Sequence, residues 1–228
     1  MIVAVTGLAR EARLIEGPDV RLVVGGGDAV ALERRLTAEL EAGARRVLSI
    51  GICGALSPDL RVGDAIIASE IVDAEGSHPT HRAWSRTLAS RLPHATVAPL
   101  AGTDEISVDP ESKARLRART RASAVDMESH IAARVARHHG LPFAALRIVS
   151  DAAHRTIPLA AQVAMRPCGG INVGAVLRSI RRAPAQVPAL LRTAWESEQA
   201  FAALFRCRHA LGGGFAGTEV GPVAFDAV

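Results

Sequence analysis

Short apolar runs alternate with longer amphipathic stretches over the first 150 residues of the chain. Runs of about four to eight residues rich in β-branched and other apolar side chains predict buried strands. Such runs occur at Ile2–Thr6, Arg21–Val24, Val47–Ile50, Ala65–Val72, Thr96–Ala101, Ala122–Val125 and Phe143–Ser150. Because these runs are separated by helical stretches, the pattern predicts βαβ units and a mostly parallel sheet.

Three stretches between these runs have apolar residues at helical spacing. They are Asp28–Ala42, Pro110–Ala118 and Met127–His139. Asp28 is suited to cap the start of the first helix, and Gly43 is suited to end it. We therefore expect an α/β fold with three layers, α/β/α, around a central mixed, mostly parallel twisted sheet.

The pattern changes after Asp151. Residues 157–211 are rich in arginine and proline and are predicted to form helices that prolines interrupt. These prolines are Pro158, Pro167, Pro184 and Pro188. The glycines at 212–214 predict the start of a loose tail, 212–228. Since no repeat is visible, we predict a single domain over 1–211 that includes the helical region.

The composition is that of an ordinary globular protein, with 49% hydrophobic and 22% charged residues among 228. The sequence has no window of about 18 uncharged apolar residues, so no transmembrane helix is expected. The first apolar run is too short for a signal peptide and lacks a basic flank. Cys53, Cys168 and Cys207 are odd in number and lack metal-binding spacing. We expect a reduced, cytoplasmic protein with no disulfide, no metal and no cofactor.

The charge is basic, with a net value of +4, and almost all of the positive residues are arginines. Nucleic acid is not expected as a partner, because acidic residues are interleaved through most of the chain and an aromatic stacking stripe is missing. The exception is 178–208, where six arginines face only Glu196 and Glu198. An anionic lipid or a phosphate-bearing partner remains open for that segment.

Polar or glycine-rich residues follow four of the predicted strands, where α/β sheets bind their ligands. Each group has an ordinary explanation on its own, such as a tight turn, a helix cap or a complement to a helix dipole. Together they predict a site at one edge of the sheet. The groups are Gly7 leading to Glu11, then Gly51, Ile52, Cys53 and Gly54, then Asp126, Met127 and Glu128, and finally Ser150 and Asp151.

Residues 124–129, Ala-Val-Asp-Met-Glu-Ser, are followed 21 residues later by Ser150-Asp151. This arrangement resembles the superfamily of nucleoside phosphorylases and methylthioadenosine/adenosylhomocysteine nucleosidases. Residues 49–56 are similar to the central glycine-rich turn of that family. Residues 102–104, which include Asp104, lie where the chain enters the base pocket in that family, and Ile106 is among the residues left near the position of an absent base-stacking aromatic. The resemblance spans residues 1 to about 155, and its motifs occur in the right order.

Residues 126–130, 157–159 and the arginine- and proline-rich stretch through Leu191 resemble a narrower group, the hopanoid-associated phosphorylases. This resemblance implies release of adenine from adenosylhopane, leaving a ribosyl or phosphoribosyl hopane, in bacterial hopanoid biosynthesis. It also implies an adenosyl lipid as substrate and a homodimer as the default assembly. The alternatives are a methylthioadenosine/adenosylhomocysteine nucleosidase, another purine nucleoside phosphorylase, and a non-catalytic nucleoside- or lipid-binding module.

The resemblance also implies roles for individual residues. Asp151 would be the acid that protonates the leaving purine. Glu128 would accept hydrogen bonds from the ribose hydroxyls, Met127 would pack against the ribose, and Asp126 would either support these residues from behind or contact the ribose itself. The remaining substrate-binding candidates are Gly51, Ile52, Cys53, Gly54, Asp104, Ile106 and Ser150.

The attacking group is the least defined part of this prediction. Glu11 matches the water-activating glutamate of the nucleosidases if a one-residue gap is allowed. Arg10 could instead bind phosphate, but the Gly-Asp-Pro phosphate loop of hexameric phosphorylases is missing, so we expect hydrolysis. A hopane tail resides in a bilayer, so residues 175–211 are our candidate for peripheral docking on the inner membrane. The same segment could instead cover the sheet or form a dimer contact.

Overall fold

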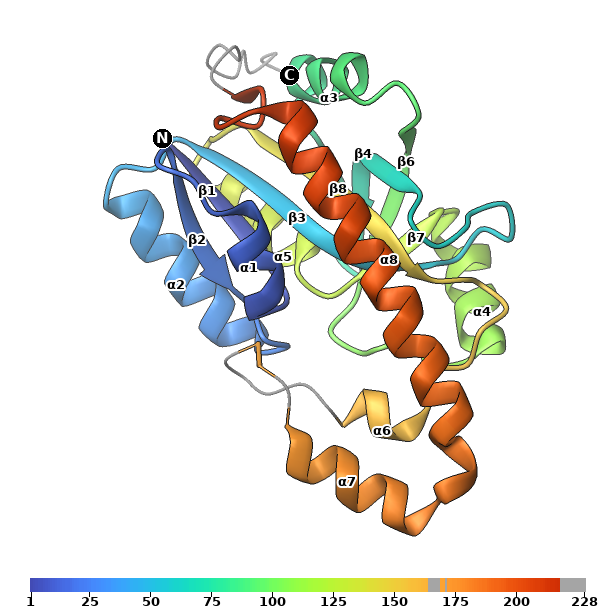
Figure 1. Ribbon diagram of the computed structural model, residues 1–228. Coiled ribbons are helices and arrows are strands. Elements are labelled where there is room, and N and C mark those ends of the chain that lie inside the picture. The colour runs from blue at the N-terminus through green and yellow to red at the C-terminus, as the bar shows by residue number, and fades with distance from the viewer. Residues whose placement is uncertain (164–168, 171, 218–228) are drawn as a thin grey trace.

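The computed structural model describes residues 1–163, 169–170 and 172–217 (Figure 1). Its strands form one mixed sheet in which parallel pairs outnumber antiparallel ones. This confirms the predicted sheet. The strands are β1 (Ile2–Thr6), β2 (Val20–Val24), β3 (Arg46–Ala55), β4 (Ala65–Val72), β5 (Ser77–Pro79), β6 (Thr96–Gly102), β7 (Ala124–Asp126) and β8 (Phe143–Asp151).

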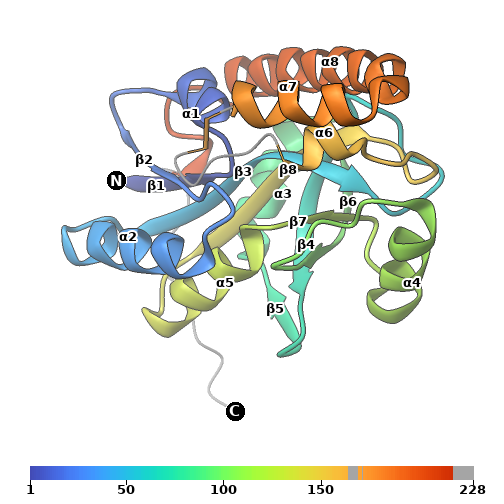
Figure 2. The ribbon, with the colours of Figure 1, turned by 90° about the horizontal axis from the view of Figure 1, so that it is seen from below.

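Helices cover both faces of the sheet, which confirms the α/β fold (Figure 2). Alternate residues along β1 separate the two faces: Val3 and Val5 pack with α2 and α5, whereas Ile2 and Ala4 pack with α3 and α8. The helices are α1 (Ala9–Ile15), α2 (Ala29–Glu41), α3 (Arg82–Arg91), α4 (Pro110–Thr120), α5 (Ser129–His138), α6 (Leu159–Gln162), α7 (Val173–Arg182) and α8 (Val187–Leu211), with a 3₁₀ turn η1 (Pro184–Gln186).

Part of the sheet closes on itself, which the sequence pattern does not predict. Strand β3 pairs with β8, β8 with β4, β4 with β6, β6 with β7, and β7 again with β3. Strands β1 and β2 extend from the first half of β3, and β5 pairs with β4. The glycine-rich stretch from Gly51 to Gly54 is therefore not a turn, as the sequence suggested, but lies inside β3.

The C-terminal region is helical as predicted, but it differs from the prediction at Pro188. Pro158 caps α6, and Pro184 opens η1. Pro188 does not interrupt a helix, because it lies in the first turn of α8, where a proline's missing N–H needs no partner. The chain therefore has one helix of 25 residues there. Pro167 and Cys168 lie outside the described residues.

The residues after α8 are not a loose tail as far as position 217. Phe215 is fully buried in the core that α3 and α8 share. The indole Nε1 of Trp84 donates a hydrogen bond to the Phe215 carbonyl at 2.9 Å. The guanidinium of Arg208 lies over the Phe215 ring, 4.8 Å from its centre. This segment therefore belongs to the folded domain, while 218–228 lie outside the described residues.

Candidate active site

The site forms where β3 changes its neighbour. Strand β1 pairs with β3 only as far as Ser49, and β7 pairs with it only from Gly54, while β8 runs along its other side. The residues between these two pairings therefore have no strand beside them on one edge. The loop after β1 and the start of α1 lie at this opening. A break of this kind at the carboxyl ends of strands is where α/β sheets form ligand sites.

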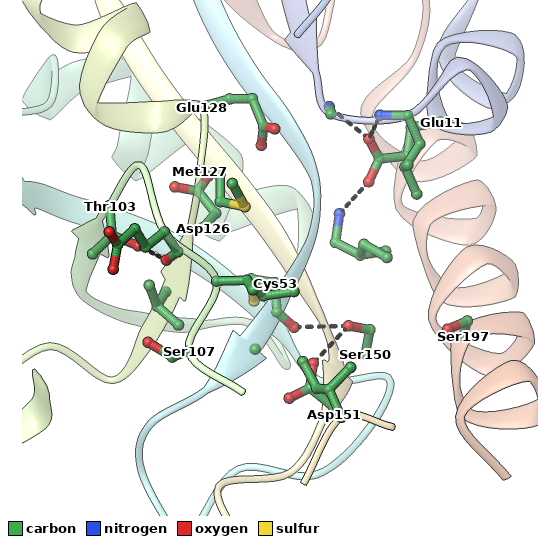
Figure 3. Close-up of a pocket in the computed structure, with 18 of the residues that line it drawn as sticks. Glu11, Cys53, Thr103, Ser107, Asp126, Met127, Glu128, Ser150, Asp151 and Ser197 are labelled. Carbon is green, nitrogen blue, oxygen red and sulfur yellow. Dashed lines mark hydrogen bonds between the residues drawn. The ribbon is translucent and has the colours of Figure 1, made fainter. Parts of the chain in front are cut away.

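A cavity of about 200 Å³ occupies this opening (Figure 3). Ten of the twelve residues predicted for the site line it, which brings together five segments that are separate in the sequence. These residues are Glu11, Ile52, Cys53, Gly54, Ile106, Asp126, Met127, Glu128, Ser150 and Asp151. Thr193 and Ser197 of α8 complete the wall on one side.

The carboxylate of Glu11 bridges the gap between β1 and β3. Its Oε2 accepts hydrogen bonds of 2.8 Å from the backbone N–H groups of Gly7 and Leu8. Its Oε1 accepts one of 2.7 Å from the backbone N–H of Ile52, which lies in the unpaired part of β3. Three backbone donors therefore fix the side chain at the cavity wall. The one-residue gap that the sequence match required is compatible with this position.

Arg147 of β8 is the centre of the charged part of the site. Its side chain is completely buried, and its Nε forms an ion pair with Asp126. Its Nη2 lies 3.6 Å from Glu128 Oε2 and donates a hydrogen bond of 2.6 Å to the Ser49 hydroxyl. Arg147 does not line the cavity itself, so it holds the acidic residues from behind.

Burial and the neighbouring charges shift the pKa values of these groups. Burial raises the pKa of Glu128 to about 8, because Arg147 offsets this effect only partly while Asp126 and Glu11 add to it. Burial also raises the pKa of Glu11, against the opposing effects of Arg147 and the three backbone donors. For Arg147, burial acts to lower the pKa, but the surrounding carboxylates outweigh it and the net shift is upward. Carboxylates with raised pKa values in a cavity are suited to proton transfer.

Asp151 ends β8 on the other side of the cavity. The pairing of β3 with β8 shifts at this point, so that Asp151 rather than Ser150 lies opposite Gly54. A side chain at Gly54 would place its Cβ 3.2 Å from Asp151 Oδ2, so glycine leaves room for the carboxylate. The Ser150 hydroxyl lies within hydrogen-bond distance of Asp151 Oδ1 (3.0 Å) and of the Cys53 carbonyl (3.1 Å).

Two predicted site residues lie outside the cavity lining. Gly51 lies behind the wall, where a Cβ would be 2.6 Å from Glu11 Oε1. The absence of a side chain at Gly51 therefore leaves space for Glu11, and Gly51 does not face the cavity. Asp104 is mostly exposed, and its Oδ1 lies 3.0 Å from His130 Nε2 in a neighbouring groove. The loop turns this side chain away, and Thr103, Glu105, Ile106 and Ser107 face the cavity in its place.

The structure also places residues for which the sequence gave no role. Arg147 lies in the predicted strand Phe143–Ser150, and its apolar neighbours in that strand are the only sequence signal that it is buried. Lys113 pairs with Asp151 from α4, and its only sequence signal is that it is the chain's single lysine.

Arg10, the candidate phosphate ligand, points outward to Glu198 and lies over Phe201.

The cysteines of the described residues do not form a disulfide. Cys53 and Cys207 are free and buried, and burial raises the pKa of the Cys53 thiol well above its usual range. Over residues 1–163, 169–170 and 172–217, no cluster of His, Cys, Asp or Glu side chains has the arrangement of a metal site. No helix in the described part of the chain has both the length and the apolarity to cross a membrane.

Comparison with protein families identifies the relationship. A family model described as the phosphorylase superfamily matches residues 3–166. The chain belongs to the phosphorylase superfamily. This family places the protein among enzymes of the nucleosidase and phosphorylase type, in agreement with the sequence analysis. The match contains every residue predicted for the site.

Solved structures related to this superfamily member share its fold at low sequence identity. The S-adenosylhomocysteine nucleosidase of Streptococcus pyogenes, bound to 5-methylthiotubericidin, is 18% identical, with a TM-score of 0.63 over 86% of this chain and 95% of that one. The futalosine hydrolase of Helicobacter pylori is 17% identical, with a TM-score of 0.63 over 91% and 96% of the two chains.

A third structure contains a bound purine base. The methylthioadenosine/S-adenosylhomocysteine nucleosidase of Colwellia psychrerythraea, in complex with adenine, is 16% identical, with a TM-score of 0.64 over 93% and 96% of the two chains. No curated protein matches the sequence significantly. At these identities the structural likeness concerns the fold of this phosphorylase-superfamily chain. Its substrate has to be argued from its own residues.

Proposed function

We propose that the protein cleaves the N-glycosidic bond of an adenine nucleoside by hydrolysis. The observation that carries this proposal is the presence of three carboxyl groups with different surroundings around one cavity. Figure 3 shows Glu11, Glu128 and Asp151 on separate sides of it, contributed by α1, the start of α5 and the end of β8. Bond cleavage at a sugar needs an acid for the leaving group, a stabiliser for the cationic sugar and a base for water.

Asp151 is the proposed acid. As the bond between C1′ and N9 breaks, negative charge develops on the purine, and a proton given to N7 makes adenine a better leaving group. Asp151 is the last residue of β8 and lines the cavity beside Ser150 and opposite Gly54, where a planar base can approach the carboxyl group. Ile106 and Val125 line the same cavity and offer apolar contact to the base.

Glu128 and Met127 are proposed to hold the ribose. The Glu128 carboxyl group can bind the two ribose hydroxyls and, in its ionised form, place negative charge near the oxocarbenium-like sugar. Met127 adds a flexible apolar contact. Asp126 stays behind them, paired with Arg147, and keeps this segment in place.

Glu11 is the proposed base that takes a proton from the attacking water. Its raised pKa makes it a stronger base than an ordinary carboxylate, and its three backbone hydrogen bonds fix its direction. Phosphorolysis would instead need cationic side chains to bind phosphate. Of the cavity-lining residues in the described part of the chain, none is a lysine or an arginine. This supports water as the nucleophile.

For the substrate, we propose an adenosyl lipid, adenosylhopane. The support is the sequence resemblance at residues 126–130 and 157–159, together with an exposed apolar side chain on the helix that forms one wall of the cavity. Thr193 and Ser197 line the cavity, whereas Trp195, between them on α8, is 65% exposed on the opposite side of the helix. A cavity of about 200 Å³ takes a nucleoside head but not a polycyclic tail. Methylthioadenosine or adenosylhomocysteine remains the alternative substrate.

The experiment compares substrates and nucleophiles. The protein is incubated with adenosylhopane in lipid vesicles and with methylthioadenosine, each with and without phosphate, and free adenine and the mass of the sugar product are measured. We expect adenine and a ribosyl product in both the presence and the absence of phosphate. A phosphorylated product would overturn hydrolysis, and faster turnover of methylthioadenosine would favour the alternative substrate.

Two variants test the assigned roles in the same assay. Asp151→Asn keeps the shape of the side chain but cannot give up a carboxyl proton, so adenine release should fall by about 10²–10⁴-fold. Glu11→Gln should also abolish most of the hydrolysis, because the amide cannot take a proton from water. Glu33→Gln, on the exposed face of α2, is the matched control and should leave the rate unchanged. Wild-type rates in either site variant would contradict its assignment.

We also propose that α7 and the exposed face of α8 dock on an anionic lipid surface. Leu177, Leu191 and Trp195 are each more than half exposed, and arginines lie among them. The acidic residues of this region, Glu196 and Glu198, pair with arginines from elsewhere in the chain. The uncompensated positive charge therefore complements an anionic membrane, and the apolar side chains can enter its interface.

Flotation with phosphatidylglycerol and phosphatidylcholine vesicles tests this docking. We expect binding to the anionic vesicles at low salt, a blue shift of Trp195 fluorescence, and loss of both in the variant carrying Arg178→Glu and Arg181→Glu. The variant carrying Arg34→Glu and Arg137→Glu, on α2 and α5, is the control with the same charge change. Equal recovery in the unbound fraction under all conditions would contradict docking, and a dimer broken by Trp195→Asp would assign this face to a second copy.

A further inference from the structure

Lys113 is the only lysine in the chain, and it is buried. It lies on α4, whose other basic residues are arginines that reach solvent to a greater extent. Its side chain is 1% exposed, so its ammonium group has left water almost completely. Burial of an unpaired ammonium is strongly unfavourable, so the partners of this group must compensate for the lost hydration.

The three protons of the Lys113 ammonium all have acceptors at the end of β8. The Nζ atom forms an ion pair with Asp151 Oδ2. It also donates hydrogen bonds to the carbonyl oxygens of Ala152 at 3.0 Å and of Arg155 at 3.2 Å. The lysine thus fixes both the carboxylate and the loop that follows it. None of these contacts is needed to form α4, which has its own cap at Asp109.

Lys113 itself does not line the cavity, whereas Asp151 does. It can therefore act on a ligand only indirectly, and Asp151 is the cavity-lining residue that it contacts. With Oδ2 held by the ammonium, Oδ1 is the oxygen left to exchange a proton with a base in the cavity. Ser150, whose hydroxyl proton can go either to Oδ1 or to the Cys53 carbonyl, allows Oδ1 to be protonated or ionised.

We propose that Lys113 is the positioning residue of the leaving-group acid Asp151, an inference that rests on the proposed function. The proton on Asp151 Oδ1 passes to purine N7 while the C1′–N9 bond breaks and its electron pair leaves with the base. The carboxylate that results is at once paired with the ammonium, so the lysine stabilises the product side of the proton transfer. After the base has left, Asp151 takes up a proton from water.

The test compares two leaving groups in Lys113→Met, which has a side chain of similar length without charge. With methylthioadenosine, which needs protonation at N7, kcat should fall by about 10- to 100-fold, a part of the 10²–10⁴-fold contribution of a general acid. With the 4-nitrophenyl riboside that carries the same 5′-methylthio group, kcat should change little, because 4-nitrophenolate leaves without a proton. Arg119→Met, an exposed cation on the same helix, should change neither rate.

Further variants separate positioning from folding. Lys113→Arg keeps the charge and should recover part of the adenine release. Adding Lys113→Met to Asp151→Asn should cause no further loss, because the lysine acts only through the acid. If Lys113→Met does not fold, Lys113→Gln and Lys113→Arg are assayed with the same two substrates.

The outcomes distinguish this inference from the proposed function. Equal losses with both leaving groups, or additive losses in the double variant, would show that Lys113 is only structural and would overturn the inference alone. Unchanged adenine release by Lys113→Met would do the same. Failure of the wild-type protein to release a purine from any nucleoside would overturn the proposed function and, with it, the acid that Lys113 is said to serve.

Discussion

Arg147 organises the acidic residues of the site although it does not line the cavity. It pairs with Asp126, approaches Glu128 and acts electrostatically on Glu11. Three carboxyl groups share one buried cation, so they cannot all be ionised without strong repulsion. Proton binding by these residues should therefore affect stability as well as chemistry.

The first prediction concerns the pH dependence of stability and Glu128. Its pKa is about 8 in the folded protein and about 4.3 in an unfolded chain. The stability associated with its proton is fully present below about pH 4.3 and is lost as the pH rises through the folded pKa, because the unfolded state releases the proton first. Burial also raises the pKa of Glu11, so protonation of Glu11 changes stability with pH in the same direction.

We expect Glu128→Gln to become more stable relative to the wild type as the pH rises from about 5 to 8. The amide resembles the protonated acid and does not titrate. Urea unfolding at several pH values measures the difference in the free energy of unfolding. Glu33→Gln, on the exposed face of α2, should keep the wild-type pH dependence. A constant difference between Glu128→Gln and wild type would contradict the raised pKa.

Gly51→Ala is the second prediction. The added Cβ would lie 2.6 Å from Glu11 Oε1 and 2.7 Å from Arg147 Nη1, and both groups are fixed by other contacts. We expect a loss of stability of about 1–3 kcal/mol, as in other overpacked interiors, and a marked loss of base release. Gly213→Ala is the control, since no heavy atom lies within 4 Å of its added Cβ. Equal behaviour of the two variants in unfolding and activity assays would refute this account.

At the scale of elements, the sequence predicted most of the strands and the helices α2, α4 and α5, but it wrongly interrupted the 25-residue helix α8 at Pro188. Periodicity located α2, and its Asp28 cap is confirmed by the hydrogen bond from the Ala31 N–H. Helices α1 and α3 and strand β5 were missed. Helix α1 has seven residues and starts without a polar capping side chain, and β5 has only three residues. Such short elements are held by tertiary contacts that a sequence pattern does not record.

The candidate site was predictable to the extent that its residues follow strands. Glu11 and Glu128 follow β1 and β7, Asp151 ends β8, and the fold brings all three to one cavity. Asp104 could not be placed correctly, because the loop that carries it has no periodic pattern to give its direction. The role of Lys113 could not be predicted from the sequence, because it depends on a contact between α4 and β8 that joins residues 38 positions apart.

The third prediction concerns the segment after α8. Phe215 fills the core beneath Trp84 and is completely buried. Phe215→Ala should lower the free energy of unfolding by about 3–5 kcal/mol, with kcat unchanged because the residue is away from the cavity. Phe205→Ala, which removes a 47% exposed ring from α8, should stay within about 0.5 kcal/mol of wild type. Denaturant unfolding of the two variants checks this, and similar losses would show that the segment is not part of the core.

At the scale of the whole molecule, the two faces of the sheet have separate cores, and the cavity lies at the break between strands. One core contains α2 and α5, and the other contains α3, α8 and Phe215. The acidic residues are contributed by segments from both halves of the chain, so the site exists only when the whole domain is folded. We therefore expect activity to be lost at the same denaturant concentration at which the domain unfolds.

The ring formed by β3, β8, β4, β6 and β7 determines how fast the backbone amides of each strand exchange with solvent. Strand β8 has partners on both sides, whereas β2 has a partner on one side only among the strands that the structure describes. In hydrogen exchange, the amides of Leu146–Ile148, which are paired on both sides, should therefore exchange only when the entire domain opens. Those of β2 should exchange earlier, through local fraying. Equal protection of the two strands would mean that the domain has no weaker edge and opens only as a single unit.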